Sequence, residues 1–340
     1  MEPHPIEHLN ESPTPPWPWT DGEALRFDHF MDRALHDPRR GYYARRIRGV
    51  GRGGDFTTTP MLSGALARAI AAWIVETGER QVIEIGPGEG RLAADVRKAL
   101  PWWSRLRTKL HLVERSAPLR EKQRALLGNK VTWHDTMEDA LAACGQRAAI
   151  YSNELIDAFP VRRFRKSATG WQELYLFPGD PPREDWREAD DLPDSTSFQQ
   201  PHPAGQIIEV HDSVARWLSP ESWPGTWQSG RMLVIDYGDT ADRLHHRRPR
   251  GTLRAYLLQQ RLEGPDAYRN PGRQDLTADV NFTDLEQWAR PWAKGSRLIT
   301  QRELLQPHVD PANPTDAAMV DPAGAGDAFK VLEIVTRTGS

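Results

Sequence analysis

Apolar and polar residues recur with two different periods in the middle of the chain, and these periods predict a regular order of strands and helices. Short apolar runs typical of buried strands alternate with segments whose apolar residues recur every three or four positions. The predicted strands are 82–85, 109–113, 131–133 and 148–152, and the predicted helices are 90–100, 117–127 and 136–143. Strands and helices that alternate in this way form a parallel sheet with right-handed crossovers. We therefore expect an α/β fold with a doubly wound, mostly parallel sheet.

The flanking regions carry less regular patterns. Helical spacing occurs at 26–35 and 61–75, on either side of a loop rich in glycine and arginine at 41–60. After residue 160 the sequence predicts strands at 206–210, 231–238 and 329–336, helical segments at 214–218, 253–262 and 285–289, and a polar, proline-rich loop or hairpin tip within 161–200. The expected units are a flexible arm (1–24), N-terminal helices with a lid loop (25–80), a ligand-binding core (81–160), an inserted substrate-side subdomain (161–230) and a C-terminal completion of the sheet (231–340) with a helical excursion at 240–290.

Composition excludes several classes of protein. The 340 residues suffice for a sizeable core, and a net charge of -3 without long runs of like charge predicts no nucleic-acid partner. The single cysteine, Cys144, excludes an internal disulfide and a cysteine-built zinc site, and no metal is expected. Because no apolar run approaches about 18 residues, we expect neither a membrane span nor a membrane partner. The paired tryptophans Trp17/Trp19 and Trp102/Trp103 are expected to serve packing.

The N-terminal residues bear on location. Residues 1–19 are acidic and rich in proline, with neither the apolar core of a secretory signal nor the arginine-rich, acid-poor composition of a transit peptide. A cytoplasmic protein is therefore expected.

A glycine turn directly follows the first strand of the regular region. Gly86, Gly88 and Gly90 are spaced G-x-G-x-G, and glycines at such a turn let a nucleotide-like ligand approach the backbone. A dinucleotide fingerprint would need its third glycine at position 91, where Arg91 stands, so a nicotinamide-linked oxidoreductase is disfavoured. With Glu84 before the turn, the segment resembles the first motif of S-adenosylmethionine (SAM) methyltransferases.

Acidic and amide side chains follow the other predicted strands, at the sheet edge where ligands of such folds bind. Glu114 after the second strand is suited to a ribose diol. Asp135 after the third could accept from an adenine amino group or cap the next helix. Glu154 and Asp157, three apart after the fourth strand, could hold a guanidinium or serve as acids favoured at a helix N-terminus. The sequence leaves both pairs of alternatives open.

An ordered set of motifs resembles the MidA-like family of SAM-dependent methyltransferases, which includes a mitochondrial assembly factor that methylates a protein arginine. The matching segments are FDHFMDRALHDPRRGYY (27–43), GGDFTTTP (53–60), EIGPGEGRLAADV (84–96), LVERSAPLREKQ (112–123), SNELIDAFPV (152–161), VIDYG (234–238), GTLRAY (251–256) and PGRQDLTADVNF (271–282). The chain departs from the family at Met61, where an acidic residue is usual, and at Ala65-Leu66, where Phe-Gly is frequent.

The resemblance implies a class I Rossmann-like methyltransferase fold with SAM as the cofactor. It implies that the lid closes over SAM and that Asn153, Glu154 and Asp157 line the acceptor side as catalytic residues. The expected cofactor contacts are Gly54, Asp55, Thr57, Thr59, Pro60, Glu84, Gly86, Pro87, Gly88, Gly90, Glu114, Arg115, Asp135 and Asn153.

The expected activity is methylation of a protein side chain, with arginine suggested by the resemblance. A protein substrate is the expected partner, and the oligomeric state is open, with a homodimer as one option. The alternative is an assembly or binding factor that retains SAM without efficient methyl transfer, an alternative that the Met61 departure motivates.

Overall fold

A central sheet with helices on both faces organises the chain in the computed structural model, which describes residues 17–20, 22–45, 64–257, 260–310, 312–322 and 324–337. Within these ranges eight strands form the sheet, seven of them in the spatial order β15 (Ala293–Thr300), β16 (Phe329–Thr336), β10 (Arg231–Asp239), β5 (Ala149–Asn153), β2 (Gln81–Ile85), β3 (Lys109–Val113) and β4 (Val131–His134). The eighth, β14 (Val280–Asn281), pairs with the end of β10. The strands from β10 to β4 are parallel, and β16 runs antiparallel to both of its neighbours. The expected doubly wound, mostly parallel sheet is confirmed.

Helices bury apolar side chains on each face of this sheet. On one face, Leu66 and Ile70 of α4 and Leu92 of α5 pack with Val82 and Val331 of the sheet. On the other face, α8 and α11 pack against the sheet together with a group of buried tryptophans. The α-helices of the described ranges are α1 (Phe27–His36), α2 (Tyr42–Arg45), α4 (Ala65–Thr77), α5 (Arg91–Ala99), α6 (Trp102–Arg107), α7 (Ala117–Leu127), α8 (Met137–Ala143), α9 (Asp212–Trp217), α10 (Ala241–Leu244), α11 (Phe282–Ala289), α12 (Gln301–Leu305), α13 (Pro314–Met319) and α14 (Ala325–Ala328).

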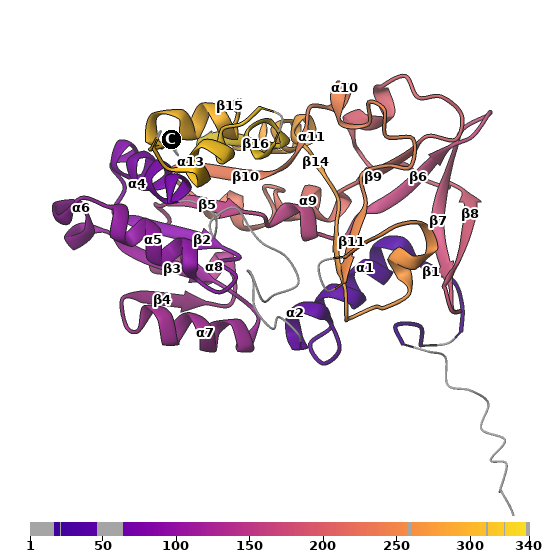
Figure 1. Cartoon of the computed structure of the whole chain (residues 1–340), viewed down its shortest axis with the longest axis horizontal. Helices are drawn as coiled ribbons and strands as arrows, with labels where there is room; N and C mark the ends of the chain where they lie inside the picture. The colour runs from indigo at the N-terminus through magenta and orange to yellow at the C-terminus, as the bar shows by residue number, and fades with distance from the viewer. Residues whose placement is uncertain are drawn as a thin grey trace, which may run out of the picture.

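Two smaller sheets lie beside the main sheet and make up the other half of the molecule (Figure 1). The first is antiparallel and consists of β1 (Leu25–Arg26), β7 (Trp171–Phe177), β6 (Arg162–Lys166) and β9 (Ile207–Val210), with β8 (Arg183–Glu188) paired to β7. The second consists of β12 (Gln260–Leu262), β11 (Arg254–Leu257) and β13 (Asp275–Thr277). Helix α1 packs its aromatic face, including Phe27 and Phe30, against both sheets, so the N-terminal helix belongs to this half.

Most predicted elements of the regular region are present within one or two residues of their expected ends. The helical prediction for 253–262 is wrong, because the described part of this segment forms β11 and β12. Only Ala255 of β11 is fully buried, and the short apolar pattern of this segment fits a helix or a strand. Pairing with the distant β13 decides in favour of a strand. The excursion at 240–290 is accordingly built from short strands as well as short helices, and 183–188 is a strand of a hairpin with β7.

Helix α6 was not predicted, and it also contradicts the expectation for the adjacent tryptophans. Trp102 and Trp103 are exposed and do not pack in the interior, whereas Trp19 of the other pair is buried against Phe30, as expected. Within the described ranges, no helix combines the length and apolar character that crossing a membrane requires.

Candidate functional site

The glycine turn connects β2 to α5 at the carboxyl edge of the sheet. Gly86, Gly88 and Gly90 all have left-handed backbone angles, with φ of 63°, 54° and 80°. A side chain on Gly86 would lie 2.6 Å from the Leu155 side chain, whereas one on Gly88 would meet no atom within 4 Å. The turn therefore needs glycine for its conformation and leaves open space in front of Gly88, which suits a ligand that contacts the backbone.

A buried glutamine ties this turn to the ends of the next two strands. Gln123 of α7 donates to the Gly88 carbonyl (2.6 Å) and to Glu114 (3.4 Å), and it accepts from the Trp133 indole (2.9 Å). Glu114 also accepts from the backbone N–H of Ser116 (2.8 Å). The structure thus brings together Gly88 and Glu114, which are both predicted cofactor residues. Gln123 also belongs to the candidate site, but it was not predicted because the prediction considered only residues at the ends of strands. Its position on the inner face of an amphipathic helix could have indicated it.

Burial dominates the electrostatics of Glu114. The side chain is buried, and desolvation raises its pKa, against the lowering effect of its hydrogen bonds to Ser116 and Gln123. A carboxylate in this setting gains from hydroxyl donors, which is what a ribose diol offers.

The remaining predicted cofactor residues lie in different surroundings. Arg115 and Asp135 are exposed, and Asp135 forms an ion pair with Arg120 of α7. The cap of α8 is Thr136, which accepts from the Asp139 N–H (3.1 Å), so the helix-cap alternative for Asp135 is wrong. Gly54, Asp55, Thr57, Thr59 and Pro60 lie outside the described residues, as does Met61.

Glu84 lies on β2 before the turn and is buried, with the Tyr151 hydroxyl donating to its carboxyl group (2.8 Å). Desolvation raises its pKa from 4.5 to about 8, although the hydrogen bond from Tyr151 opposes this. This contact anchors the carboxyl group to the neighbouring strand β5, beneath the glycine turn.

The raised pKa of Glu84 predicts a pH-dependent stability difference. Because the folded state keeps the proton up to about pH 8 and the unfolded state releases it near pH 4.5, the stabilisation is complete below pH 4.5 and is lost as the pH rises to 8. Glu84→Gln cannot ionise, so its unfolding temperature relative to wild type should rise between pH 5 and pH 9, by on the order of 5 °C. Differential scanning calorimetry would measure this, with the exposed Glu138→Gln as the matched control. A difference that stays flat with pH would contradict a buried, protonated Glu84.

The three predicted catalytic residues lie at the end of β5 and on the turn that follows it, and a carboxylate from β10 holds this turn. One oxygen of the fully buried Asp236 accepts from the backbone N–H groups of Leu155 (3.1 Å), Ile156 (2.8 Å) and Asp157 (3.3 Å). Its other oxygen accepts from the Tyr237 N–H (2.9 Å). Glu154 adopts a left-handed backbone with φ of 51°, a conformation that costs a non-glycine residue on the order of 1 kcal/mol or more. Asp236 therefore stabilises an otherwise unfavourable turn.

Residues from distant parts of the chain surround this turn. The Tyr43 hydroxyl of α2 donates to Asp275 of β13 (3.2 Å), and the Tyr43 carbonyl accepts from the Ser116 hydroxyl (2.9 Å). The Ala278 N–H donates to the Asp157 carbonyl (2.9 Å), which joins the turn to the segment after β13. Helix α2 thus contacts both the end of β3, where the predicted cofactor residue Glu114 lies, and the group of carboxyl side chains around Asp157.

The carboxyl groups of Glu154, Asp157, Asp236 and Asp275 lie close together and form what we call the acidic side of the site. Desolvation, followed by the charges of Asp236, Glu154 and Asp275, raises the pKa of Asp157 well above its usual range, and nearby Arg254 opposes this. Burial also raises the pKa of Asp236, to about 7, despite its backbone hydrogen bonds. Arg254 is itself paired with Asp279 (2.6 Å) and lies over the Tyr237 ring (4.9 Å). The excess of carboxyl groups favours a cationic ligand on this side.

Asn153 is the last residue of β5, the strand that lies between β2, with its glycine turn, and β10, with Asp236. Its amide nitrogen donates to Glu154 (3.1 Å), while its carbonyl oxygen is buried without a hydrogen-bond partner. A buried oxygen of this kind can be satisfied by a donor group on a bound ligand. Within the described ranges, no group of three or more His, Cys, Asp or Glu side chains is arranged to hold a metal ion.

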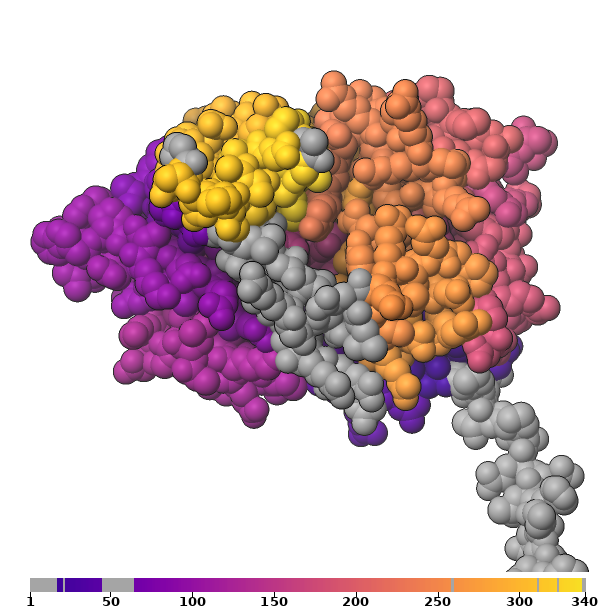
Figure 2. Space-filling model, viewed as in Figure 1, coloured from indigo at the N-terminus to yellow at the C-terminus, as the bar shows by residue number. Residues whose placement is uncertain are grey.

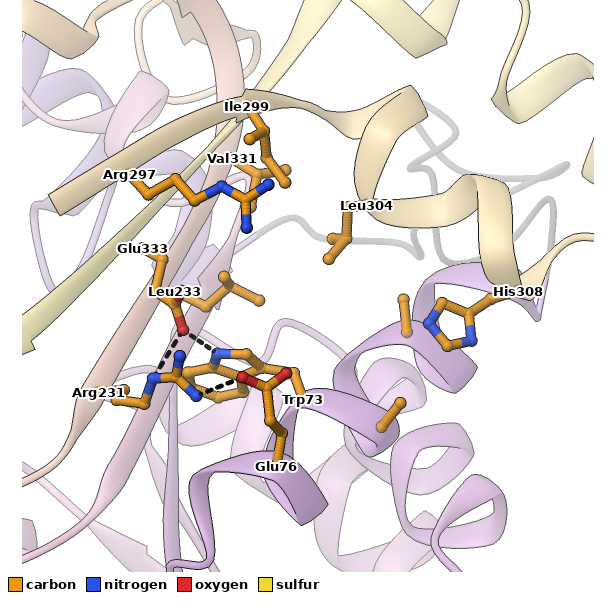
Figure 3. Close-up of a pocket in the computed structure, with 12 residues that line it drawn as sticks. Trp73, Glu76, Arg231, Leu233, Arg297, Ile299, Leu304, His308, Val331 and Glu333 are labelled. Carbon is orange, nitrogen blue, oxygen red and sulfur yellow. Dashed lines mark hydrogen bonds and ion pairs between the residues drawn. The ribbon is translucent and has the colours of Figure 1, made fainter.

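A cavity of about 210 Å³ lies elsewhere on the sheet, between α4 and the strands β10, β15 and β16. Trp73, Arg231, Glu333 and Arg297 line it, and Figure 3 shows the Arg231 guanidinium between Glu76 and Glu333. Among the predicted cofactor and catalytic residues that the structure describes, none borders this cavity.

The fold and site together define a class of protein. A mostly parallel sheet in which the last strand of the chain, β16, runs antiparallel, with a glycine turn after β2 and an acid after β3, is the arrangement of class I SAM-dependent methyltransferases. A model of a family of S-adenosyl-L-methionine-dependent methyltransferases matches residues 65–297. The chain belongs to this family, and SAM is the cofactor of the family.

Relatives and solved structures agree with this assignment. A Caenorhabditis elegans protein named protein arginine methyltransferase NDUFAF7 homolog, mitochondrial, is 27% identical over 296 residues, which cover 74% of this chain and 65% of that protein. The human protein arginine methyltransferase NDUFAF7, mitochondrial, is 26% identical over 314 residues, covering 82% and 68%. This chain spans about two thirds of the length of these relatives.

A crystal structure from Burkholderia thailandensis with bound S-adenosyl-homocysteine superposes with a TM-score of 0.78 at 26% identity, covering 94% of this chain and 89% of that chain. A second structure from the same organism has a TM-score of 0.73 at 25% identity. S-adenosyl-homocysteine is what remains of SAM after methyl transfer. The resemblance and the fold predicted from the sequence are therefore confirmed.

Proposed function

We propose that this protein transfers the methyl group of SAM to an arginine side chain of a protein substrate. The observation that carries the proposal is the pair of acids on the turn after β5, Glu154 and Asp157, in surroundings with an excess of carboxyl groups. A guanidinium is planar and can donate to two carboxylates at once, so it satisfies such a site better than a hydroxyl or an amine.

The cofactor would lie against the glycine turn, with Glu114 at its ribose and the Asn153 oxygen at its methionine ammonium group. When bound, SAM supplies a methyl group on a sulfonium. The role of Glu154 and Asp157 would be to hold the guanidinium so that one nitrogen lone pair points at that methyl carbon. As the carbon–sulfur bond breaks and the carbon–nitrogen bond forms, the nitrogen becomes more acidic and loses a proton. Asp157, whose pKa is raised, is suited to accept it.

The names of the relatives support a protein arginine as the acceptor. Both relatives are also named as mitochondrial proteins. The cytoplasmic location expected from residues 1–19 therefore has no support from these relatives.

A methyl-transfer assay tests the proposal. Purified protein is incubated with SAM carrying a tritiated methyl group and a cell lysate, and labelled proteins are digested and analysed by mass spectrometry. We expect label on an arginine nitrogen of a protein. Label on another side chain would overturn the arginine assignment. Tight SAM binding without transfer to any protein would favour the alternative of an assembly factor that retains SAM.

The contacts of Asp236 predict a positioning role that can be separated from cofactor binding. Asp236→Asn keeps the shape but replaces one acceptor oxygen with a donor, which opposes either the Tyr237 N–H or the N–H groups of Leu155 to Asp157. We expect a fall in kcat of about tenfold or more, since small displacements of catalytic groups are costly, with the affinity for S-adenosyl-homocysteine unchanged.

Asp284→Asn is the matched control, because Asp284 is also buried and accepts several hydrogen bonds, from Ser195 and Thr196, away from the site. Faster hydrogen exchange at Leu155–Asp157 in Asp236→Asn alone would show that the turn has loosened. Equal loss of kcat in both variants would mean that the effect is only general destabilisation.

A further inference from the structure

Helix α6 presents an unusual surface at one extremity of the molecule. The side chains of Trp102, Trp103 and Leu106 are 69%, 45% and 79% exposed, and they are three of the five large apolar side chains that stand out as exposed in the described ranges. Positions 102, 103 and 106 share one face of a helix, because residues three and four apart are neighbours. They therefore form one apolar patch and not scattered exposures.

The same helix buries a polar side chain on its opposite face. Ser104 is only 7% exposed, and its hydroxyl lies 3.4 Å from that of Thr108. Helices of water-soluble domains normally turn their apolar face inward, so α6 has the reverse orientation. Leaving two tryptophans and a leucine in water is unfavourable unless another surface covers them.

The charges around this apolar patch are all of one sign along the chain. Between Asp95 and Glu114 the sequence holds five cationic residues and no acidic one: Arg97, Lys98, Arg105, Arg107 and Lys109. Lys98 is paired with Asp95 (2.9 Å), while Arg107 and Lys109 are exposed. The surface that covers the apolar patch is therefore expected to be anionic.

The shape of this end of the molecule narrows the choice of partner. Figure 2 shows it as a tapering, convex projection, and Figure 1 places α6 at the opposite end from β7 and β8. A single-stranded nucleic acid would be held in a basic groove by stacking on aromatic rings, which gives Leu106 no role. Tryptophan and leucine next to arginine and lysine are the combination that inserts into the interface of an anionic bilayer.

We propose that α6, with the cations on either side of it, is a peripheral docking surface for anionic phospholipid membranes. Trp102, Trp103 and Leu106 would enter the headgroup region, and Arg107 and Lys109 would remain at the lipid phosphates. This proposal changes the expectation that the protein has no membrane partner, because that expectation rested only on the lack of membrane-spanning segments. The proposed docking surface does not depend on which side chain is the methyl acceptor.

The position of α6 keeps the candidate site accessible in the docked state. Helix α6 leads directly into β3, so it lies at the amino edge of the parallel strands. The glycine turn and the acidic turn lie at the carboxyl edge. Docking through α6 would therefore turn the site away from the bilayer, toward proteins in solution or the exposed parts of membrane-bound ones.

Co-sedimentation of the full chain with vesicles tests this proposal. We expect binding when about a third of the lipid is phosphatidylserine, and at least fivefold weaker binding to pure phosphatidylcholine. Trp102→Ser with Trp103→Ser should weaken binding by about tenfold or more. Arg107→Glu with Lys109→Glu should weaken it by at least about 25-fold, at about fivefold per cation, and added salt should weaken wild-type binding in the same direction.

The controls come from exposed leucines elsewhere. Leu126 and Leu192 are 47% and 46% exposed, and Leu126→Ser with Leu192→Ser should leave vesicle binding unchanged. Unchanged affinity for S-adenosyl-homocysteine would show that every variant is folded. Absence of wild-type binding to anionic vesicles would overturn the proposal, as would equal binding by the tryptophan variant. Binding to a single-stranded oligonucleotide in place of vesicles, or a tryptophan-dependent dimer, would assign α6 to another partner.

Discussion

Glu154→Gln and Asp157→Asn are each expected to lower kcat for methyl transfer by about 10²–10³-fold, while the affinity for SAM stays within about twofold. Each substitution removes a negative charge that would hold and orient the guanidinium, but leaves the glycine turn and Glu114 intact. The effect should be on kcat more than on KM, because the charges act on the orientation reached in the transition state. Stopped assays with radiolabelled SAM and an arginine-containing protein acceptor would measure both constants.

Calorimetric titration with S-adenosyl-homocysteine provides the control for these two variants. Asp157 lies among carboxyl groups that repel its charge, so Asp157→Asn is also expected to be at least as stable as wild type. A loss of turnover therefore could not be assigned to unfolding. If both variants retain full turnover, Glu154 and Asp157 do not form the acceptor site.

Glu114→Ala should weaken the binding of SAM and S-adenosyl-homocysteine by about 10- to 150-fold if one hydrogen bond is lost, and by more if two are lost. A charged hydrogen-bond acceptor contributes about 1.5–3 kcal/mol per bond, and a ribose diol would make one or two such bonds to this carboxylate. The substitution also removes the partner of the Ser116 N–H and of the Gln123 amide, so some loss of stability is expected.

Two further variants separate these effects. Glu121→Ala makes the same change at an exposed position of α7 and should leave cofactor affinity unchanged. Glu114→Gln keeps an acceptor for the Ser116 N–H but lacks the charge, so its affinity should be intermediate. Wild-type affinity in Glu114→Ala would rule out the ribose role and direct attention to other residues at the ends of β3 and β4.

The sequence predicted those parts of the molecule that depend on neighbours in the chain. The strands β2, β3, β4 and β5 and the helices α5, α7 and α8 follow from local periodicity, and the positions of Glu114 and Asp157 follow from where those strands end. The outer region was less predictable. The segment 253–262 has a short pattern, and its conformation is decided by pairing with β13, which the local sequence does not contain.

The candidate site likewise has parts that the local sequence predicts and parts that depend on contacts between distant segments. Motif reasoning indicated the glycine turn and the acids after the strands, and their roles in binding and catalysis stay predictions. It could not show that Tyr43 and Asp275 meet beside Asp157, because they come from three distant segments. It also could not show that Asp236 of β10 holds the turn at Glu154 through backbone hydrogen bonds. Such contacts depend on tertiary packing.

The position of β10 between β5 and β16 has a consequence for how the protein is made. As the chain leaves the ribosome, β2, β3, β4 and β5 can pair early, but the second edge of β5 stays open until β10 emerges, after the whole of β6 to β9. Until then the turn after β5 lacks Asp236, and an unpaired central strand can associate with other chains. We therefore expect nascent chains that stop between β5 and β10 to depend on chaperones, and the turn after β5 to form only after synthesis has passed Asp236.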